Sequence, residues 1–239
     1  MTTTVPQPAK LRGRPAPCWP GTIAIPLAEF GKSLDDADLD EWFEAFAERN
    51  SDMAEYEISS TGHLLIREPT GNPGSVYETE LAGDVLFWSR QSGGIAFGST
   101  SRFILPDGSR FGPDAAWIPE GRRHEIMLPE NRPFPRIVPD FIAEIKSPSN
   151  SNAELLNKID LFLEHGTKLA WFIDAETRTV IKFRPGQEPE TLHDPEYIDG
   201  DDDMLPGFRF AVRERIFDLF TDIEHQEMQD AAGEQGSTD

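Results

Sequence analysis

The chain has 239 residues, of which 38% are hydrophobic, enough for one globular domain with a buried core. Its formal net charge of −21, from 43 acidic and 22 basic residues, weighs against tight nonspecific binding to nucleic acid. The single cysteine, Cys18, excludes an intrachain disulfide and a cysteine-based zinc site, and it fits a reducing, cytoplasmic setting.

Composition divides the chain into three parts. Residues 1–20 contain five prolines and little periodicity, which predicts a flexible leader. Residues 226–239 have the composition of a disordered acidic tail, and residues 21–225 between them are predicted to form a single domain. The sequence shows neither a signal-peptide pattern nor a long apolar run, so we expect no membrane partner.

The first half of the domain predicts two helices separated by a hairpin. The first helix signal lies at residues 33–36, where Ser33 is suited to be the N-cap, and apolar residues follow at helical spacing. Residues 56–66 alternate around a Ser-Thr-Gly turn, which predicts a β-hairpin. The second helix is predicted over residues 75–90, and its inward stripe is Tyr77, Leu81, Val85 and Trp88.

The second half predicts mostly strands and one long helix. The helix is expected over residues 152–165, ending at Gly166, and residues 119–137 are expected to form a loop. An acidic run at 199–203 is interpreted as a solvated turn. Strands are predicted at residues 95–97, 101–105, 113–118, 169–174 and 179–184, and around Glu144 within residues 138–149. This order predicts a mixed α/β (α+β) fold, with a mixed β-sheet flanked by helices.

The most informative stretch is residues 138–149, Val-Pro-Asp-Phe-Ile-Ala-Glu-Ile-Lys-Ser-Pro-Ser. Because a strand alternates faces, Glu144 and Lys146 should share one face of this apolar strand. Burying a carboxylate and an ammonium costs free energy unless they are paired or hold a metal. The pair is therefore either a structural salt bridge or part of a functional site.

Asp114, which opens a neighbouring predicted strand, supplies a second carboxylate. Two carboxylates from adjacent strands can chelate one hard cation such as Mg²⁺ or Mn²⁺, which activates a water molecule. Lys146 can then orient that water or stabilise charge that develops on a phosphate. Asp140 also follows a proline, but it lies roughly 13 Å from Glu144 along the same strand, too far to share one ion.

The series from Pro113-Asp114 to Glu144-x-Lys146, followed by a helix and an apolar strand, resembles the PD-(D/E)xK nuclease superfamily. The wider sequence is similar to one branch of it, the Uma2 (DUF820) family of restriction-endonuclease-like proteins. The resemblance covers roughly residues 25–220. The matching segments are residues 75–90, 111–117, 139–149, 171–174, 184–186 and 205–208, with Leu156, Lys158 and Gly166.

The resemblance implies a restriction-endonuclease-like core that uses Mg²⁺ or Mn²⁺. It assigns Asp114 and Glu144 as metal ligands and Lys146 as the catalytic lysine. In this superfamily an acid on the first core helix often completes the site; Glu80 matches that place best, and Glu78 is the fallback. Two further positions match the family. One is Glu57, an acid whose role the resemblance leaves open. The other is Lys158, which is interpreted either as a phosphate contact or as a solvated helix charge.

Two functions of different classes follow from these residues. The first is a divalent-metal-dependent endonuclease that hydrolyses phosphodiester bonds with a metal-activated water, with DNA favoured over RNA as the nucleic-acid partner. The alternative is a catalytically silent binding or assembly module, because a duplex-binding enzyme usually shows a basic face and this chain is acidic. A homodimer, formed through the helix of Trp42 and Phe46 or through the aromatic C-terminal segment, is compatible with either.

Overall fold

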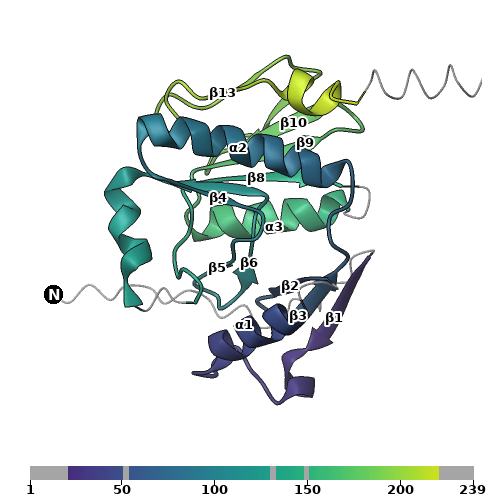
Figure 1. Cartoon of the computed structure of the whole chain (residues 1–239), viewed down its shortest axis with the longest axis vertical. Coiled ribbons are helices and arrows are strands. Elements are labelled where there is room, and N and C mark those ends of the chain that lie inside the picture. Colours follow the sequence, from purple (N-terminus) through teal and green to yellow (C-terminus); the bar gives the residue numbers. More distant parts are fainter. Residues whose placement is uncertain (1–20, 51–53, 130–132, 148–150, 221–239) are drawn as a thin grey trace, which may run out of the picture.

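The computed structural model describes residues 21–50, 54–129, 133–147 and 151–220. Within them the chain forms a central six-stranded sheet and a smaller five-stranded sheet, with helices on their faces (Figure 1). The predicted fold class, a mixed sheet flanked by helices, is confirmed. The predicted leader at 1–20 and tail at 226–239 lie outside the described residues.

The central sheet has the strand order β11-β10-β9-β8-β7-β4. Only β8 and β9 run parallel; the remaining neighbours are antiparallel. A parallel pair needs a crossover connection, and helix α3 (Asn152–His165) supplies it. The strands are β4 (Ile95–Gly98), β7 (Ala115–Ile118), β8 (Phe141–Lys146), β9 (Leu169–Asp174), β10 (Thr179–Phe183) and β11 (Glu190–His193).

The two faces of β8 pack against different helices, as its alternation predicts. Phe141, Ala143 and Ile145 join one apolar core with residues of helix α2 (Gly74–Ser92). Ile142, from the opposite face, joins a second core with residues of α3. The sheet therefore lies between α2 and α3 (Figure 1), and Glu144 points toward the α3 side.

The smaller sheet, with the order β1-β3-β2-β6-β5, lies beyond α3 in Figure 1. Leu65 of this sheet packs in the same core as Ile142 and α3, which brings the two sheets together around that helix. Helix α1 (Leu39–Arg49) covers the outer face with a third core. The strands are β1 (Thr22–Pro26), β2 (Glu55–Ile58), β3 (His63–Arg67), β5 (Phe103–Ile104) and β6 (Arg110–Phe111).

Short elements complete the described chain. They are the 3-10 helices η1 (Leu27–Phe30) and η2 (Glu120–Met127), the strands β12 (Ile198–Asp199) and β13 (Arg209–Phe210), and the single-turn π-helix η4 (Arg213–Phe217). Of the described helices, none combines the length and the apolar character needed to cross a bilayer.

The hairpin, the helices at 75–90 and 152–165, the strand around Glu144 and the strand at 169–174 are confirmed. The start of the first helix was predicted wrongly. Ser33 closes a turn instead, because its backbone N–H and its Oγ donate to the Asp36 carboxylate at 2.8 and 2.9 Å, and the helix begins at Leu39. The segment 119–137 is not only a loop, since it contains η2.

One surface interpretation also changes. The rings of Trp42 and Phe46 contact each other in a tilted arrangement with centroids 5.4 Å apart, and they also contact Phe30 and Tyr56, while the predicted homodimer stays a prediction. The acidic run is not merely a solvated turn, because Asp201 accepts hydrogen bonds from Lys182 and Arg184, each at 2.8 Å. It thereby attaches this turn to β10.

We predict that Asp201→Asn lowers the free energy of unfolding at pH 7 by about 1 to 2 kcal/mol. The Arg184 guanidinium, helped by Lys182, lowers the pKa of the Asp201 carboxyl to about 2, against the opposing effect of partial burial. A lowered folded-state pKa stabilises the protein above the unfolded value, near 4, and this contribution is lost as the pH falls toward 2. Urea unfolding at several pH values should show the difference narrowing below about pH 4. The exposed Asp202→Asn is the control, and an equal effect of both substitutions would contradict the prediction.

Candidate active site

The two carboxylates predicted as metal ligands do meet. Strands β7 and β8 pair with Ala115 opposite Ala143, so the preceding Asp114 lies across from the following Glu144. The Asp114 carboxylate accepts the backbone N–H of Ile145 at 2.6 Å, which fixes it against β8. Glu144 itself is buried, with 1% of its surface exposed. The structure thus brings together the two carboxylates named from the sequence, and their role as metal ligands stays a prediction.

Their environment disfavours negative charge. Burial raises the pKa of Asp114 well above its usual range, and the charges of Glu144 and Glu78 raise it further. Burial likewise raises the pKa of Glu144 to about 7, although Lys158 acts in the opposite direction. Two facing carboxylates that resist ionisation are stabilised by a cation placed between or beside them.

The cation that the structure provides is Lys158. Its Nζ donates to the backbone oxygen of Gly112 at 2.6 Å and lies 3.0 Å from Glu144 Oε1 and 3.4 Å from Glu57 Oε1. With 4% of its surface exposed, Lys158 is a buried residue on the inner face of α3, and the solvated interpretation of it was wrong. The remaining interpretation, a phosphate contact, stays a prediction.

Lys146 is on the same face of β8 as Glu144, as predicted, but its ammonium has other partners. Its Nζ lies 3.3 Å from Asp174 on the adjacent strand β9 and 3.0 Å from Glu176 just beyond it. Lys146 pairs with Asp174 in the strand register, which explains the contact. The structure therefore brings Lys158, rather than Lys146, into contact with Glu144.

Glu80 is not brought to the site. Its carboxylate accepts a hydrogen bond from Arg215 of η4 at 2.6 Å. Residues two apart on a helix point in nearly opposite directions, so the fallback Glu78 faces the other way. The charge of Glu78 acts on Asp114, and Thr70 and Ser99 hydrogen bond to its carboxylate. Asp140, excluded as a ligand from its spacing, is buried in ion pairs with Arg122 and Lys168.

Glu57 and Arg67 form a part of the site that the sequence did not assign. Glu57 Oε2 lies 2.5 Å from Arg67 Nη2, and both side chains are buried. Leu65, on the same face of the hairpin as Arg67, packs toward α3. The sequence signal for Arg67 was its position two residues after the apolar Leu65, which puts both on the same face of the strand. The sequence signal for Glu57 was its match to the family.

The opening beside these groups is small and polar. It has a volume of about 10 Å³, which is roughly the space that one water molecule or one ion occupies. Its lining residues are Glu55, Arg67, Glu68, Thr70, Ser99, Gly112, Asp114, Glu144 and Lys158.

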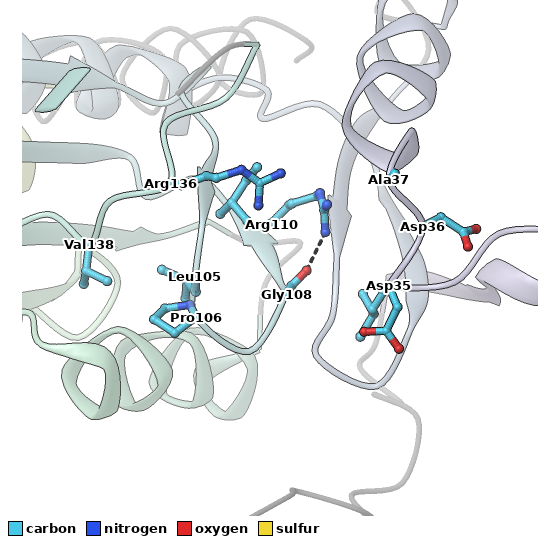
Figure 2. Close-up of a pocket in the computed structure, with 11 residues that line it drawn as sticks. Asp35, Asp36, Ala37, Leu105, Pro106, Gly108, Arg110, Arg136 and Val138 are labelled. Atoms are coloured by element: carbon cyan, nitrogen blue, oxygen red, sulfur yellow. Dashed lines mark hydrogen bonds between the residues drawn. The ribbon is translucent and has the colours of Figure 1, made fainter. Parts of the chain in front are cut away.

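A larger pocket of about 400 Å³ lies elsewhere, between residues 34–37 and the turn at 104–110 (Figure 2). Arg110 and Arg136 line it, and the guanidinium groups of both pair with the Asp40 carboxylate. This pocket shares no lining residue with the opening at Asp114 and Glu144. Its two cations therefore hold α1 to β6 of the small sheet, through Arg110, and to the segment before β8, through Arg136.

The carboxylate pair suits a hard divalent cation. Among the described residues no group of three or more His, Cys, Asp or Glu is arranged to hold a metal ion. Mg²⁺, however, is often held by one or two carboxylates and completes its shell with water and substrate phosphate. Glu144 Oε1 is buried and accepts no hydrogen bond within the described ranges, and its polar neighbour is the Lys158 ammonium at 3.0 Å. Asp114 and Glu144 therefore fit as the two protein ligands of such an ion.

We predict that the two lysines differ strongly in their effect on stability. Lys158→Met leaves Glu144 and Glu57 buried without their shared cation, and we expect it to cost about 3 to 5 kcal/mol of unfolding free energy. Lys146→Met, near the surface, should cost about 1 kcal/mol or less. Urea unfolding of both variants at pH 7 measures the difference. An equal loss of unfolding free energy in the two variants would contradict the prediction, because the Lys158 ion pairs would then stabilise the fold no more than those of Lys146.

Comparison with known proteins identifies the family and the fold of the chain. A family model described as "Uma2: Putative restriction endonuclease" matches residues 40–213. A crystal structure described as "a putative nuclease belonging to DUF820 from Anabaena variabilis ATCC 29413" matches with a TM-score of 0.57 and 23% sequence identity. The match covers 69% of this chain and 90% of that chain, and at this identity it shows the fold alone. No curated protein matches the chain. The predicted resemblance is confirmed: the chain belongs to the Uma2 family, a family of restriction-endonuclease-like proteins.

Proposed function

We propose that the protein is a divalent-metal-dependent endonuclease that hydrolyses phosphodiester bonds of DNA. The observation that carries the proposal is the facing pair Asp114 and Glu144, with the buried ammonium of Lys158 at 3.0 Å from Glu144. The description of the matching family supports a nuclease, and the fold of the structural neighbour is consistent with it.

In this proposal Asp114 and Glu144 hold Mg²⁺ or Mn²⁺. When bound, the ion supplies a water of lowered pKa and neutralises charge on the phosphodiester. The backbone N–H of Ile145 keeps the Asp114 carboxylate oriented toward Glu144. Burial of Glu144 excludes bulk water from the reacting groups, which strengthens the electrostatic interactions between them.

We propose different roles for the two lysines. Lys158, held by Gly112 and by two carboxylates, stabilises the charge that develops on the phosphate oxygens. Lys146 was predicted for this role, and it stands one pleat further along β8, held by Asp174 and Glu176. We propose that Lys146 contacts the phosphate backbone beside the scissile bond, since its side chain is 18% exposed.

The alternative, a catalytically silent module for binding or assembly, has one observation in its favour. Lys158 already provides Glu144 with a cation, so the fold satisfies this carboxylate without a metal. The net charge of −21 also gives no general attraction for nucleic acid. The alternative differs from the nuclease in a measurable way, because a module of this kind has no need to bind Mn²⁺ at Asp114 and Glu144.

We predict metal-dependent cleavage that requires the carboxylate pair. Supercoiled plasmid, single-stranded DNA and RNA are each incubated with Mg²⁺ or Mn²⁺. Asp114→Asn and Glu144→Gln should lower the cleavage rate by about 100-fold or more, and EDTA should abolish it. Glu80→Gln, an α2 acid outside the site, is the matched control and should leave the rate unchanged. Equal cleavage by wild type and Glu144→Gln on every substrate would reject the nuclease proposal.

A binding measurement separates the two functions without a substrate. We predict that calorimetry detects about one Mn²⁺ per chain in the wild type and none in Glu144→Gln, because a lost carboxylate removes one of two protein ligands. Glu80→Gln should bind as the wild type does. Binding that is equal in all three proteins would place the ion elsewhere and leave the silent module as the better account.

A further inference from the structure

We infer that Glu57, a buried carboxylate of the small sheet, is a positioning residue for the Asp114–Glu144 site. It holds both the chain segment that leads to Asp114 and the ammonium that lies on Glu144. The inference rests on the proposed function, and it adds a residue from a separate sheet, β2, to the groups on which that function depends.

The first contact is to the backbone before Asp114. Glu57 Oε1 accepts a hydrogen bond from the backbone N–H of Gly112 at 3.0 Å. The backbone carbonyl of Gly112 in turn accepts a hydrogen bond from Lys158 Nζ at 2.6 Å. Gly112 is joined to Asp114 through Pro113, whose ring fixes the backbone φ angle. A Cβ at residue 112 would collide with the Ser101 carbonyl oxygen, so the backbone is closely packed at this position. Glu57 thus anchors the approach to Asp114.

The second contact is between Glu57 and the ammonium of Lys158. The ammonium lies 3.0 Å from Glu144 and 3.4 Å from Glu57, so both carboxylates attract it. Without the charge of Glu57, the ammonium would be drawn more fully onto Glu144. A metal ion approaching Glu144 would then compete with a more tightly held cation. Glu57 therefore keeps Glu144 available as a ligand.

A third contact keeps Glu57 ionised and oriented. Arg67 pairs with its Oε2 at 2.5 Å, and despite the burial of Glu57 the nearby cations, Arg67 first among them, hold the pKa of Glu57 below its usual value. On its other side Arg67 pairs with Glu154 at 3.0 Å, and Glu154 also accepts from Thr22. Glu154 shares the arginine with Glu57, but among the described residues it forms no hydrogen bond or ion pair with Gly112 or Lys158. It is therefore the natural control.

The test compares Glu57→Gln with Glu154→Gln. Each removes one buried carboxylate partner of Arg67, and both should lower the free energy of unfolding. Only Glu57→Gln should weaken Mn²⁺ binding by about tenfold in calorimetry, equivalent to roughly 1.4 kcal/mol. It should also lower kcat on the cleaved substrate by at least about tenfold while KM changes little. Glu154→Gln should retain the Mn²⁺ affinity and kcat of the wild type.

A double variant distinguishes charge sharing from a merely structural role. In Glu57→Gln/Lys158→Met the competing ammonium is gone, so Mn²⁺ affinity should return to at least the wild-type value while cleavage stays low. The double variant removes one buried acid and one buried base together, so the buried charge stays balanced. It is therefore expected to fold even if Glu57→Gln alone is unstable.

The results separate this inference from the function on which it rests. Equal Mn²⁺ affinity and kcat in Glu57→Gln and Glu154→Gln would overturn the role of Glu57 and leave the nuclease intact. A double variant that binds Mn²⁺ more weakly than Glu57→Gln would also overturn it. Wild-type protein that neither binds Mn²⁺ nor cleaves would overturn the proposed function, and the inference with it.

Discussion

The buried ammonium of Lys158 is the interaction on which the arrangement of the site depends. An ammonium in the interior is stable only when carboxylates and carbonyl oxygens surround it, and here they come from β2, β8 and the segment before β7. These elements are far apart in sequence, so one side chain enforces their mutual distance. The α3 helix that carries it is the crossover between the two parallel strands, which leaves the helix little freedom to move.

Much of the fold could be predicted, because its elements have strong local patterns. The alternation in residues 141–146 placed Glu144 on the face opposite Phe141, Ala143 and Ile145, and helical spacing predicted α2 and α3 to within a few residues. The start of α1 could not be predicted in this way, because Ser33 and Asp36 satisfy each other in a turn of their own. A turn and a helix cap are both local hydrogen-bonding options for such residues, and the spacing of apolar residues does not choose between them.

The strand pattern and the family resemblance pointed to Asp114 and Glu144, and the structure brings these two residues together, whereas the surroundings of the helix residues could not be predicted. The choice between Glu78 and Glu80 depends on which side of α2 faces β7, and the sequence gives the apolar side but not the orientation of the polar residues. A lysine on a helix is ordinarily solvated, so nothing local distinguished Lys158 before its three partners were known.

The contact between Glu57 and Lys158 changes what counts as the minimal unit of this fold. A nuclease-like core that begins at α2 would keep the central sheet, α3 and both facing carboxylates. It would lose β2 and β3, and with them one of the two carboxylates that Lys158 contacts. The hairpin of β2 and β3 therefore completes the site from outside the nuclease-like core. A rearranged gene would have to keep this hairpin together with the segment that begins at α2 to preserve every partner of Lys158.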